Sequence, residues 1–158
     1  MKNLYELQNK LFKQEIEIIL DKAKNNPNEH IKVIIGKVSK RLVSDGMQNG
    51  FDLSDYVHNI DVSGLRHAFK HHGKNNEKIN TQIPINNDDV KQIPQMLYNY
   101  DSVTFGTKDS KGTDIIKYQK QVSSYELVYL EEIRTGKKTL TIKSMYKKKP
   151  LASAIYQS

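Results

Sequence analysis

Three of the five histidines of the chain lie in the stretch LRHAFKHHG, residues 65–73. If this stretch is a helix, His67 and His71 are one turn apart and point the same way, and a turn at Gly73 can bring His72 back towards the same space. Histidine transfers protons near neutral pH because its pKa lies close to the operating pH. The residue types and their spacing therefore indicate an acid–base site.

A metal site and a solvent-exposed helix end are the alternatives to an acid–base site. His67 and His71 have the spacing of two metal ligands, but residues 68–70 lack the glutamate of the zinc protease helix, and the chain has no cysteine. We therefore expect no metal and no other cofactor. At an exposed helix end, the histidines would be stabilised as imidazolium by the helix dipole. The residues alone do not decide between the acid–base site and the helix end.

RNA cleavage without a metal needs several such groups on a rigid surface. A base removes the proton of the ribose 2′-OH, the oxygen attacks phosphorus, and an acid protonates the departing 5′-oxygen. Cations and hydroxyls stabilise the charge on the phosphoryl oxygens. The chain offers Lys117 and Lys120 in IIKYQKQ, and Thr141, Ser144 and Tyr146 in LTIKSMY. The two lysines are three apart, so a regular strand turns them to opposite faces; of the two, we favour Lys120 for the site.

The excess positive charge lies in the same part of the chain as these groups. The net charge is +7; residues 1–62 carry nine Lys/Arg and nine Asp/Glu, whereas residues 63–158 carry sixteen and nine. A basic half beside a neutral half indicates contact with a polyanion such as RNA, with a lysine-rich soluble surface as the alternative. No apolar run approaches the roughly 20 residues that cross a bilayer, so we expect no membrane contact.

The apolar pattern predicts helices first and strands later. Leucines and isoleucines recur at helical spacing over residues 3–24 and again over 31–42, which predicts a helical hairpin for scaffolding or docking. Asp61 or Ser63 can cap a short helix through the histidine stretch. A second short helix is expected in NNDDVKQIPQMLYN, limited or bent by Pro94.

After residue 100 the pattern changes to the period of two that is typical of strands. Four runs, SVTF, GTDIIKYQKQV, YELVYLEEI and KTLTIKSMY, are separated by short turns that contain glycine or serine. We therefore predict an α+β fold, in which short helices follow the N-terminal hairpin and lie on one side of an antiparallel sheet of about four strands. The expected regions are a helical 1–58, an α+β domain at 59–149 and a tail at 150–158.

The order of these motifs resembles the phage-associated nuclease-like domains of the barnase–EndoU–colicin–RelE superfamily, which occur in phage head-morphogenesis and other mobile-element polypeptides. The resemblance covers roughly residues 60–149. It places the family's histidine pair at His67 and His72, with His71 competing for the second place. The lysine-bearing strand corresponds to IIKYQKQ and the closing strand to the ending Ser144, Met145 and Tyr146. It implies a barnase/EndoU-like fold and metal-independent phosphodiester cleavage.

The prediction is a metal-independent endoribonuclease that acts as a toxin or effector module of a phage or mobile element. His67 and His72 would be base and acid, Lys120 and Ser144 would stabilise the phosphorane, and Tyr146 would donate a hydrogen bond or stack on a base. Further residues expected to contact RNA are Arg66, Lys70, His71, Lys74, Lys117, Thr141, Lys143 and Lys147.

Other functions fit the same sequence. The chain could have kept the fold and lost the chemistry, and then bind RNA or inhibit a host protein through its N-terminal helices. A structural virion component is a third candidate. Expected partners are RNA, with tRNA among the targets, an acidic immunity or antitoxin protein, and a host or phage protein. The resemblance implies a place in the cytoplasm of the bacterial host or in the virion.

Overall fold

The computed structural model describes residues 12, 14–21, 25, 31–72, 82–83 and 85–149, and the side chains of 69–72 and 82 lie outside this description. Residues 14–21 are helical. The further elements are β1 (Lys32–Lys37), α2 (Lys40–Gln48), β2 (Val57–Asp61), α3 (Val62–His72), β3 (Gln82–Ile83), α4 (Asn87–Val90), α5 (Ile93–Tyr98), β4 (Ser102–Lys108), β5 (Asp114–Val122), β6 (Tyr125–Arg134) and β7 (Thr139–Lys148).

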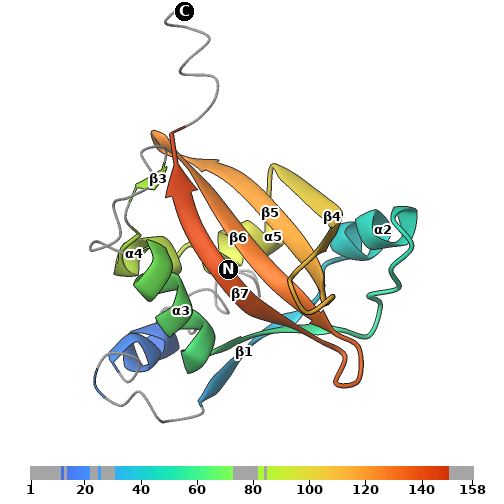
Figure 1. Ribbon diagram of the computed structural model, residues 1–158, viewed down its shortest axis with the longest axis horizontal. Coiled ribbons are helices and arrows are strands. Elements are labelled where there is room, and N and C mark those ends of the chain that lie inside the picture. The colour runs from blue at the N-terminus through green and yellow to red at the C-terminus, as the bar shows by residue number, and fades with distance from the viewer. Residues whose placement is uncertain are drawn as a thin grey trace, which may run out of the picture.

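The strands form one mixed sheet (Figure 1). Six of them follow the order β1-β2-β7-β6-β5-β4, and β3 pairs with the end of β7. β2 and β7 run parallel, whereas the other neighbours run antiparallel. The fold is α+β, as predicted, but the sheet has seven strands where the sequence predicted about four. The boundary expected after residue 58 lies inside β2, which pairs with both β1 and β7.

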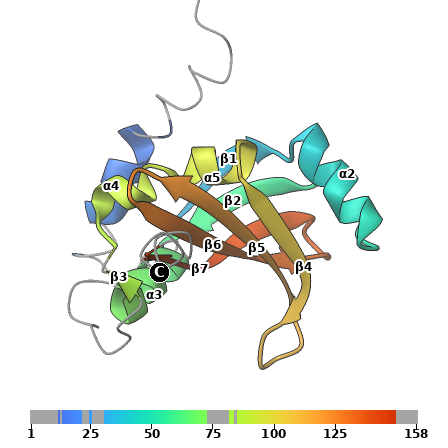
Figure 2. The same ribbon diagram turned by 90° about the horizontal axis from the view of Figure 1, so that it is seen from above.

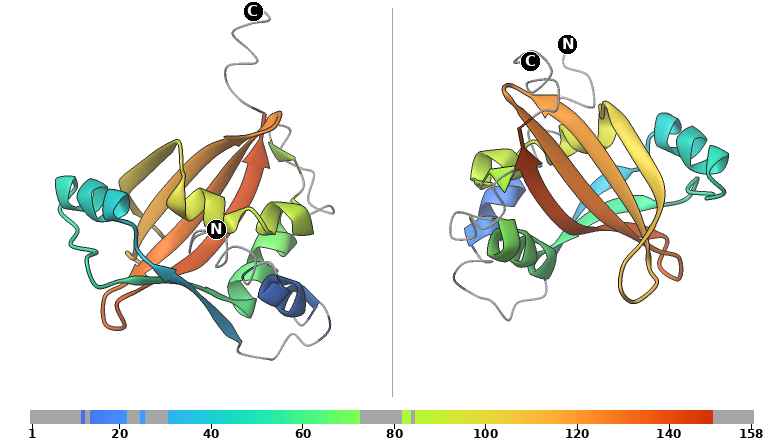
Figure 3. Two further views of the ribbon diagram at one scale, coloured as in Figure 1. Left: turned by 180° about the vertical axis from the view of Figure 1, so that it is seen from behind. Right: turned by 45° about the horizontal axis from the view of Figure 1, so that its top comes forward.

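Among the described residues, helices cover one face of the long strands β4–β7. Helix α5 and the helical segment 14–21 lie on the same side of these strands (Figure 2), and α5 crosses the sheet when it is seen from behind (Figure 3). Buried side chains of Ile116, Leu127 and Met96 belong to the core on this side, which we call the helix face. The opposite side, which no described helix covers apart from α3 at its border, is called the open face. Helix α3 lies along β7, at the border of both faces.

The predicted second helix over residues 31–42 is wrong. The chain forms strand β1 first and begins α2 only at Lys40, with Ser39 as its N-cap. Val33 is buried while Ile34 is 70% exposed, the alternation of an edge strand. The β-branched run from Val33 to Ile35 fits a strand better than a helix, and the helical spacing of the isoleucines concealed this preference. The predicted helical hairpin is therefore absent from the described residues.

The expected strands after residue 100, the Asp61 cap and the effect of Pro94 are confirmed. The four predicted runs after residue 100 are strands β4–β7. Asp61 caps α3, since its carboxylate accepts from the Gly64 N–H at 2.6 Å. Pro94 occupies the first turn of α5, so the predicted second short helix is split into α4 and α5. In the part of the chain that the structure describes, no helix is both long and apolar enough to cross a bilayer.

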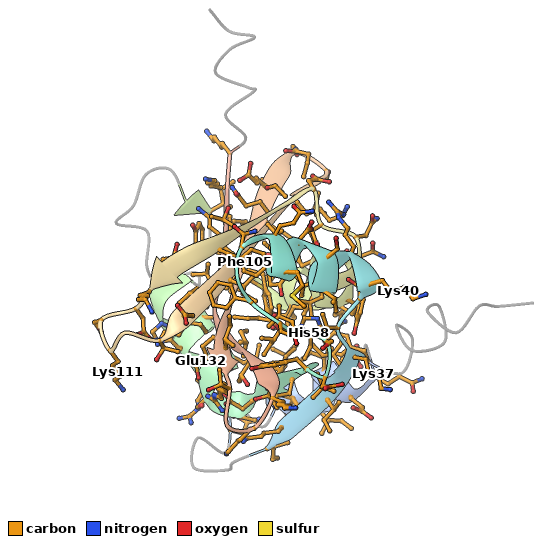
Figure 4. All side chains as sticks on the ribbon, turned by 90° about the vertical axis from the view of Figure 1, so that its right-hand side faces the viewer. Lys37, Lys40, His58, Phe105, Lys111 and Glu132 are labelled. Carbon is orange, nitrogen blue, oxygen red and sulfur yellow. The ribbon has the colours of Figure 1, made fainter. Side chains whose placement is uncertain are left out.

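A fully buried polar cluster lies on the helix face. The Glu131 carboxylate on β6 bonds to His58 Nδ1 on β2 at 2.8 Å and accepts from the Tyr118 hydroxyl on β5 at 2.6 Å. All three residues have no exposed surface. Figure 4 shows His58 deep among packed side chains, whereas Lys37 and Lys40 lie at the surface. Because a buried carboxylate is stable only when it is hydrogen-bonded, the cluster ties β2, β6 and β5 together.

Removal of this carboxylate should destabilise the protein strongly. Glu131→Ala leaves a cavity and two buried polar groups without a partner, so we expect a loss of about 3 kcal/mol or more in the free energy of unfolding. The matched control is Glu126→Ala on the same strand, whose carboxylate is partly exposed and should cost less than about 1 kcal/mol. Urea unfolding monitored by circular dichroism measures both; equal losses would contradict the prediction.

Stability should also fall at alkaline pH. Burial, and then the charge of Glu131, raise the pKa of Tyr118 and Tyr129 well above the ordinary value. Their contribution is complete below about pH 10, where the unfolded chain begins to lose these protons while the folded chain keeps them. Above that pH the free energy of unfolding should fall on the order of 1 kcal/mol per pH unit for each tyrosine. Unfolding at pH 8–11 should show a shallower fall for Tyr118→Phe; an unchanged slope would rule out this role of Tyr118.

Candidate functional site

Helix α3 is held unusually close to strand β7. At Gly64 a Cβ atom would lie 2.5 Å from the Cγ2 of Ile142 and 2.9 Å from its carbonyl oxygen. Asp61 fixes the first turn by accepting from both the Ser63 hydroxyl and the Gly64 N–H. The glycine and the cap therefore set the distance of His67, which is exposed one turn further along α3, from β7.

The close approach leaves an open cleft between α3 and the ends of β6 and β7. Its volume is about 190 Å³. We call it the α3–β7 cleft; it is lined by Asp61, Ser63, Gly64, His67, Glu132, Arg134, Ile142 and Lys143. Its walls are mainly polar and charged, and His67 is the histidine that the sequence placed first in its candidate site.

A β-bulge aims Lys143 into this cleft. Leu130 pairs with Ser144 and Glu131 pairs with Ile142, so Lys143 is the extra residue of β7. Bulges of this kind redirect a side chain and are frequent beside active sites. The bulge places Ile142, and not Lys143, opposite the buried Glu131 on the helix face.

The cations of the cleft are already paired with carboxylates. Arg134 bonds to Glu132 through Nε at 2.6 Å and Nη2 at 2.5 Å, and its Nη2 lies 3.8 Å from Asp61. Lys143 lies 3.3 Å from Asp109, which belongs to the turn between β4 and β5. An incoming phosphate would have to compete with these carboxylates.

The turn that carries Asp109 is internally braced. The pKa of Asp109 is lowered, chiefly because its carboxylate accepts from the backbone N–H of Thr113, and further by the N–H of Lys111 and by Lys143. The tip of this hairpin projects from the body, with Lys111 at its end (Figure 4). The ion pair between Asp109 and Lys143 therefore joins the hairpin to β7.

A second group of polar residues lies on the open face beyond the bulge. Lys117, Leu130 and Ser144 are directly opposite one another on β5, β6 and β7. Ser144 is 6% exposed, and its Oγ has no hydrogen-bond partner among the described residues. Lys117 is half-buried, and no carboxylate of the described chain pairs with it. A cation without a counter-ion thus shares a row with an unpaired hydroxyl.

Tyr146 lies one row further along the open face, opposite Val128. Burial raises the pKa of its hydroxyl, and the charge of Glu126 raises it further. The hydroxyl is therefore protonated at neutral pH and can donate a hydrogen bond. Thr141 also lies on the open face, but it is fully buried, and its hydroxyl donates to Asn59 at 2.5 Å.

The structure brings some of the predicted residues together and separates others. His67 and Lys143 line the cleft, and Lys117, Ser144, Tyr146 and Thr141 lie on the adjoining open face. Arg66 is partly buried on α3, and its Nε has no hydrogen-bond partner among the described residues. The side chains of Lys70, His71 and His72, and the whole of Lys74, lie outside the described residues.

Lys120 and Lys147 are not placed with this group. The prediction that Lys117 and Lys120 face opposite sides is confirmed, but Lys120 points to the helix face, where its amine donates to the Asn99 carbonyl at 2.7 Å. Lys147 shares that face and pairs with Asp89 at 2.9 Å. The preference for Lys120 is not supported, because strand parity alone did not reveal which face was covered by helices.

Sequence reasoning missed the charged residues Glu132 and Arg134, and it gave Asp61 only the role of a cap. The signal for Glu132 was present in YLEEIR, where two adjacent carboxylates interrupt an apolar strand. Strand alternation must send these carboxylates to opposite faces, one to the core and one to the surface. Within the described residues, no group of three or more His, Asp or Glu is arranged to hold a metal ion.

Comparisons with known proteins identify a family. The family model described as "phage-Barnase-EndoU-ColicinE5/D-RelE like nuclease3" matches residues 30–153, which includes all of β1–β7. The match confirms the resemblance that the sequence motifs showed and extends it back through β1 and α2. Searches of curated proteins and of solved structures found no significant match.

The contact of α3 with β7 can be tested at Gly64. In Gly64→Ala the new methyl group meets Ile142, so the helix must shift, and we expect a net loss of about 1–2 kcal/mol in the free energy of unfolding despite the higher helix propensity of alanine. The control is Gly136→Ala, where no atom lies within 4 Å of the added carbon. Urea unfolding and the NMR shift of the Ile142 methyl groups measure the effect; wild-type stability for Gly64→Ala would contradict it.

Proposed function

Because the chain belongs to this family of phage-associated nucleases, we propose that it is a metal-independent endoribonuclease whose active site lies on the open face beside α3. One observation carries the proposal. Lys117, which has no ion pair in the described chain, shares a row with the buried, unpaired hydroxyl of Ser144. Buried hydroxyls are rarely left without a partner, so an unpaired one in the same row as a cation without an ion pair in the described chain, with Leu130 between them, suits an anionic ligand.

The proposed reaction is an intramolecular transesterification of RNA. His67, with His72 as the second histidine, transfers the protons: one ring removes the proton of the ribose 2′-OH, and the other protonates the 5′-oxygen as its bond to phosphorus breaks. The new bond joins the 2′-oxygen to phosphorus. The products are a 2′,3′-cyclic phosphate and a free 5′-hydroxyl.

The groups of the open face would stabilise the phosphorane. The ammonium of Lys117 and the hydroxyl of Ser144 neutralise charge on the phosphoryl oxygens, where a fixed donor acts most strongly in a site sheltered from water. The Tyr146 hydroxyl, protonated at neutral pH, donates a further hydrogen bond. Lys117 thus takes the role that the sequence assigned to Lys120.

The test is cleavage of total RNA and of a 5′-labelled oligoribonucleotide by the full chain in EDTA. We expect fragments that end in 2′,3′-cyclic phosphate. His67→Ala should lower the rate about 10²- to 10⁴-fold, which is the usual contribution of a general acid or base, and His67→Ala combined with His72→Ala should abolish cleavage. Intact RNA with the wild-type protein, in EDTA and in Mg²⁺ alike, would overturn the proposal and favour a binding protein without catalysis.

Two lysines of one strand provide the matched control. Lys117→Ala should lower kcat about 10²-fold, because it removes a fixed donor to the transition state. Lys120→Ala removes the same charge from the same strand but on the helix face, and it should leave kcat unchanged. Thermal unfolding of both variants separates loss of fold from loss of chemistry. Equal losses of kcat in stable proteins would refute the assignment of Lys117.

A further inference from the structure

The α3–β7 cleft is electrically balanced. Asp61 and Glu132 contribute two negative charges, and Arg134 and Lys143 contribute two positive charges, so these four lining groups sum to zero. Asp109 adds a further carboxylate at the amine of Lys143. A phosphate would gain little here, because it would have to displace a carboxylate from each cation. The cleft is therefore better suited to a neutral ligand than to a phosphate group.

The volume of the cleft suits a small ring system. About 190 Å³ lies below the roughly 300–1,000 Å³ of pockets that enclose a whole drug-sized ligand. It is about six times the roughly 30 Å³ occupied by one water molecule. The cleft is lined by His67, the candidate acid–base histidine. In a nuclease that acts on RNA, the neutral ring system that would lie next to this histidine is an unpaired base of the RNA.

Two carboxylate oxygens of the cleft are left without a hydrogen-bond partner among the described residues. Glu132 accepts from Arg134 through Oε1 alone, and its Oε2 has no partner among the described residues. Asp61 uses Oδ1 for Ser63 and Gly64, and its Oδ2 lies 3.8 Å from Arg134, beyond hydrogen-bond distance. The Glu132 Oε2 and Asp61 Oδ2 oxygens thus remain to accept N–H groups. Arg134 holds Glu132 by two contacts, which fixes this arrangement.

An exocyclic amine is the base substituent that such oxygens recognise. An amine donates two hydrogen atoms, whereas the carbonyl oxygen that replaces the amine of cytosine in uracil would be repelled by the carboxylates. Hypoxanthine carries only a hydrogen atom where guanine has its amine, so it would leave the carboxylate oxygens without a donor. We propose that the α3–β7 cleft binds a nucleobase with an exocyclic amine, and that Glu132 is the residue that selects it. The proposal rests on the proposed function, because it places this base next to the scissile phosphate.

The binding test uses nucleoside monophosphates in matched pairs. GMP and IMP differ only in the amine at C2 of the purine, and CMP and UMP differ by an amine in place of a carbonyl oxygen at C4 of the pyrimidine. NMR titration of the wild-type protein should show binding of GMP or CMP about 10- to 100-fold tighter than binding of IMP or UMP, with shifts at Gly64 and Ile142. Equal affinity within both pairs, or shifts elsewhere, would overturn the proposal.

Glu132→Gln gives the sharper result. The amide replaces an acceptor by a donor, so the preference for the amine should be lost and binding of UMP and IMP should improve relative to CMP and GMP. The matched control is Glu126→Gln, which changes another open-face carboxylate on β6 and should leave the preference intact. A preference that survives Glu132→Gln would refute the role of Glu132.

Cleavage of oligoribonucleotides that carry a single guanosine or inosine at the cleaved step separates this inference from the proposed function. Cleavage without any preference, together with equal binding of GMP and IMP, would remove the base site and leave the ribonuclease. Binding of GMP over IMP without RNA cleavage would keep the base site and refute the ribonuclease. The absence of both would refute both.

Discussion

The buried carboxylate of Glu131 is the constraint on which the rest of the sheet depends. The strands that it joins are not all neighbours, since the order is β2-β7-β6-β5 and its bond to His58 passes across β7. β2 pairs with β7 over three residues only, so the bond from Glu131 to His58 supplements a short parallel ladder. The hydroxyl of Tyr118 completes the shell from β5. Because a buried charge without partners is costly, the four strands can pack only in an arrangement that satisfies it.

The same carboxylate determines what reaches the open face. Residues 131 and 132 are both glutamates, so a shift of one residue in β6 would leave the sequence at this point nearly unchanged and exchange the two side chains between the faces. Glu131 is held by His58 and Tyr118, and the bulge at Lys143 accommodates the extra residue of β7. Glu132 and Lys143 are thereby placed in the cleft. The register of β6 therefore determines both the polar core and the polar cleft.

The structural features that the sequence predicted correctly are those that depend on short-range patterns. The period of two was enough for β4–β7, because strand parity is a short-range property. The prediction of a helix over 31–42 was wrong because the isoleucines there fit helical and extended spacing equally well. Only the pairing of β1 with β2 decides between a helix and a strand. In the site, spacing predicted that Lys117 and Lys120 separate, but it could not tell which face the helices cover. The partnership of Lys143 with Asp109 was also out of reach, because it depends on how the β4–β5 hairpin lies against β7.

Net charge is a poor guide to where such a protein meets an anion. The chain carries +7, yet Lys91, Lys120 and Lys147 each lie within 4 Å of a carboxylate, and the cations of the cleft do too. When a phosphate binds a paired cation, it replaces a carboxylate, so the gain is only the difference between two similar ion pairs. When it binds an unpaired cation, the whole attraction is gained. Lys117 would therefore attract a phosphate more strongly than the paired lysines do. A nucleotide with its base in the balanced cleft and its phosphate towards Lys117 on β5 would place each group where its charge is favoured. This division of charge between the cleft and β5 would orient the RNA strand.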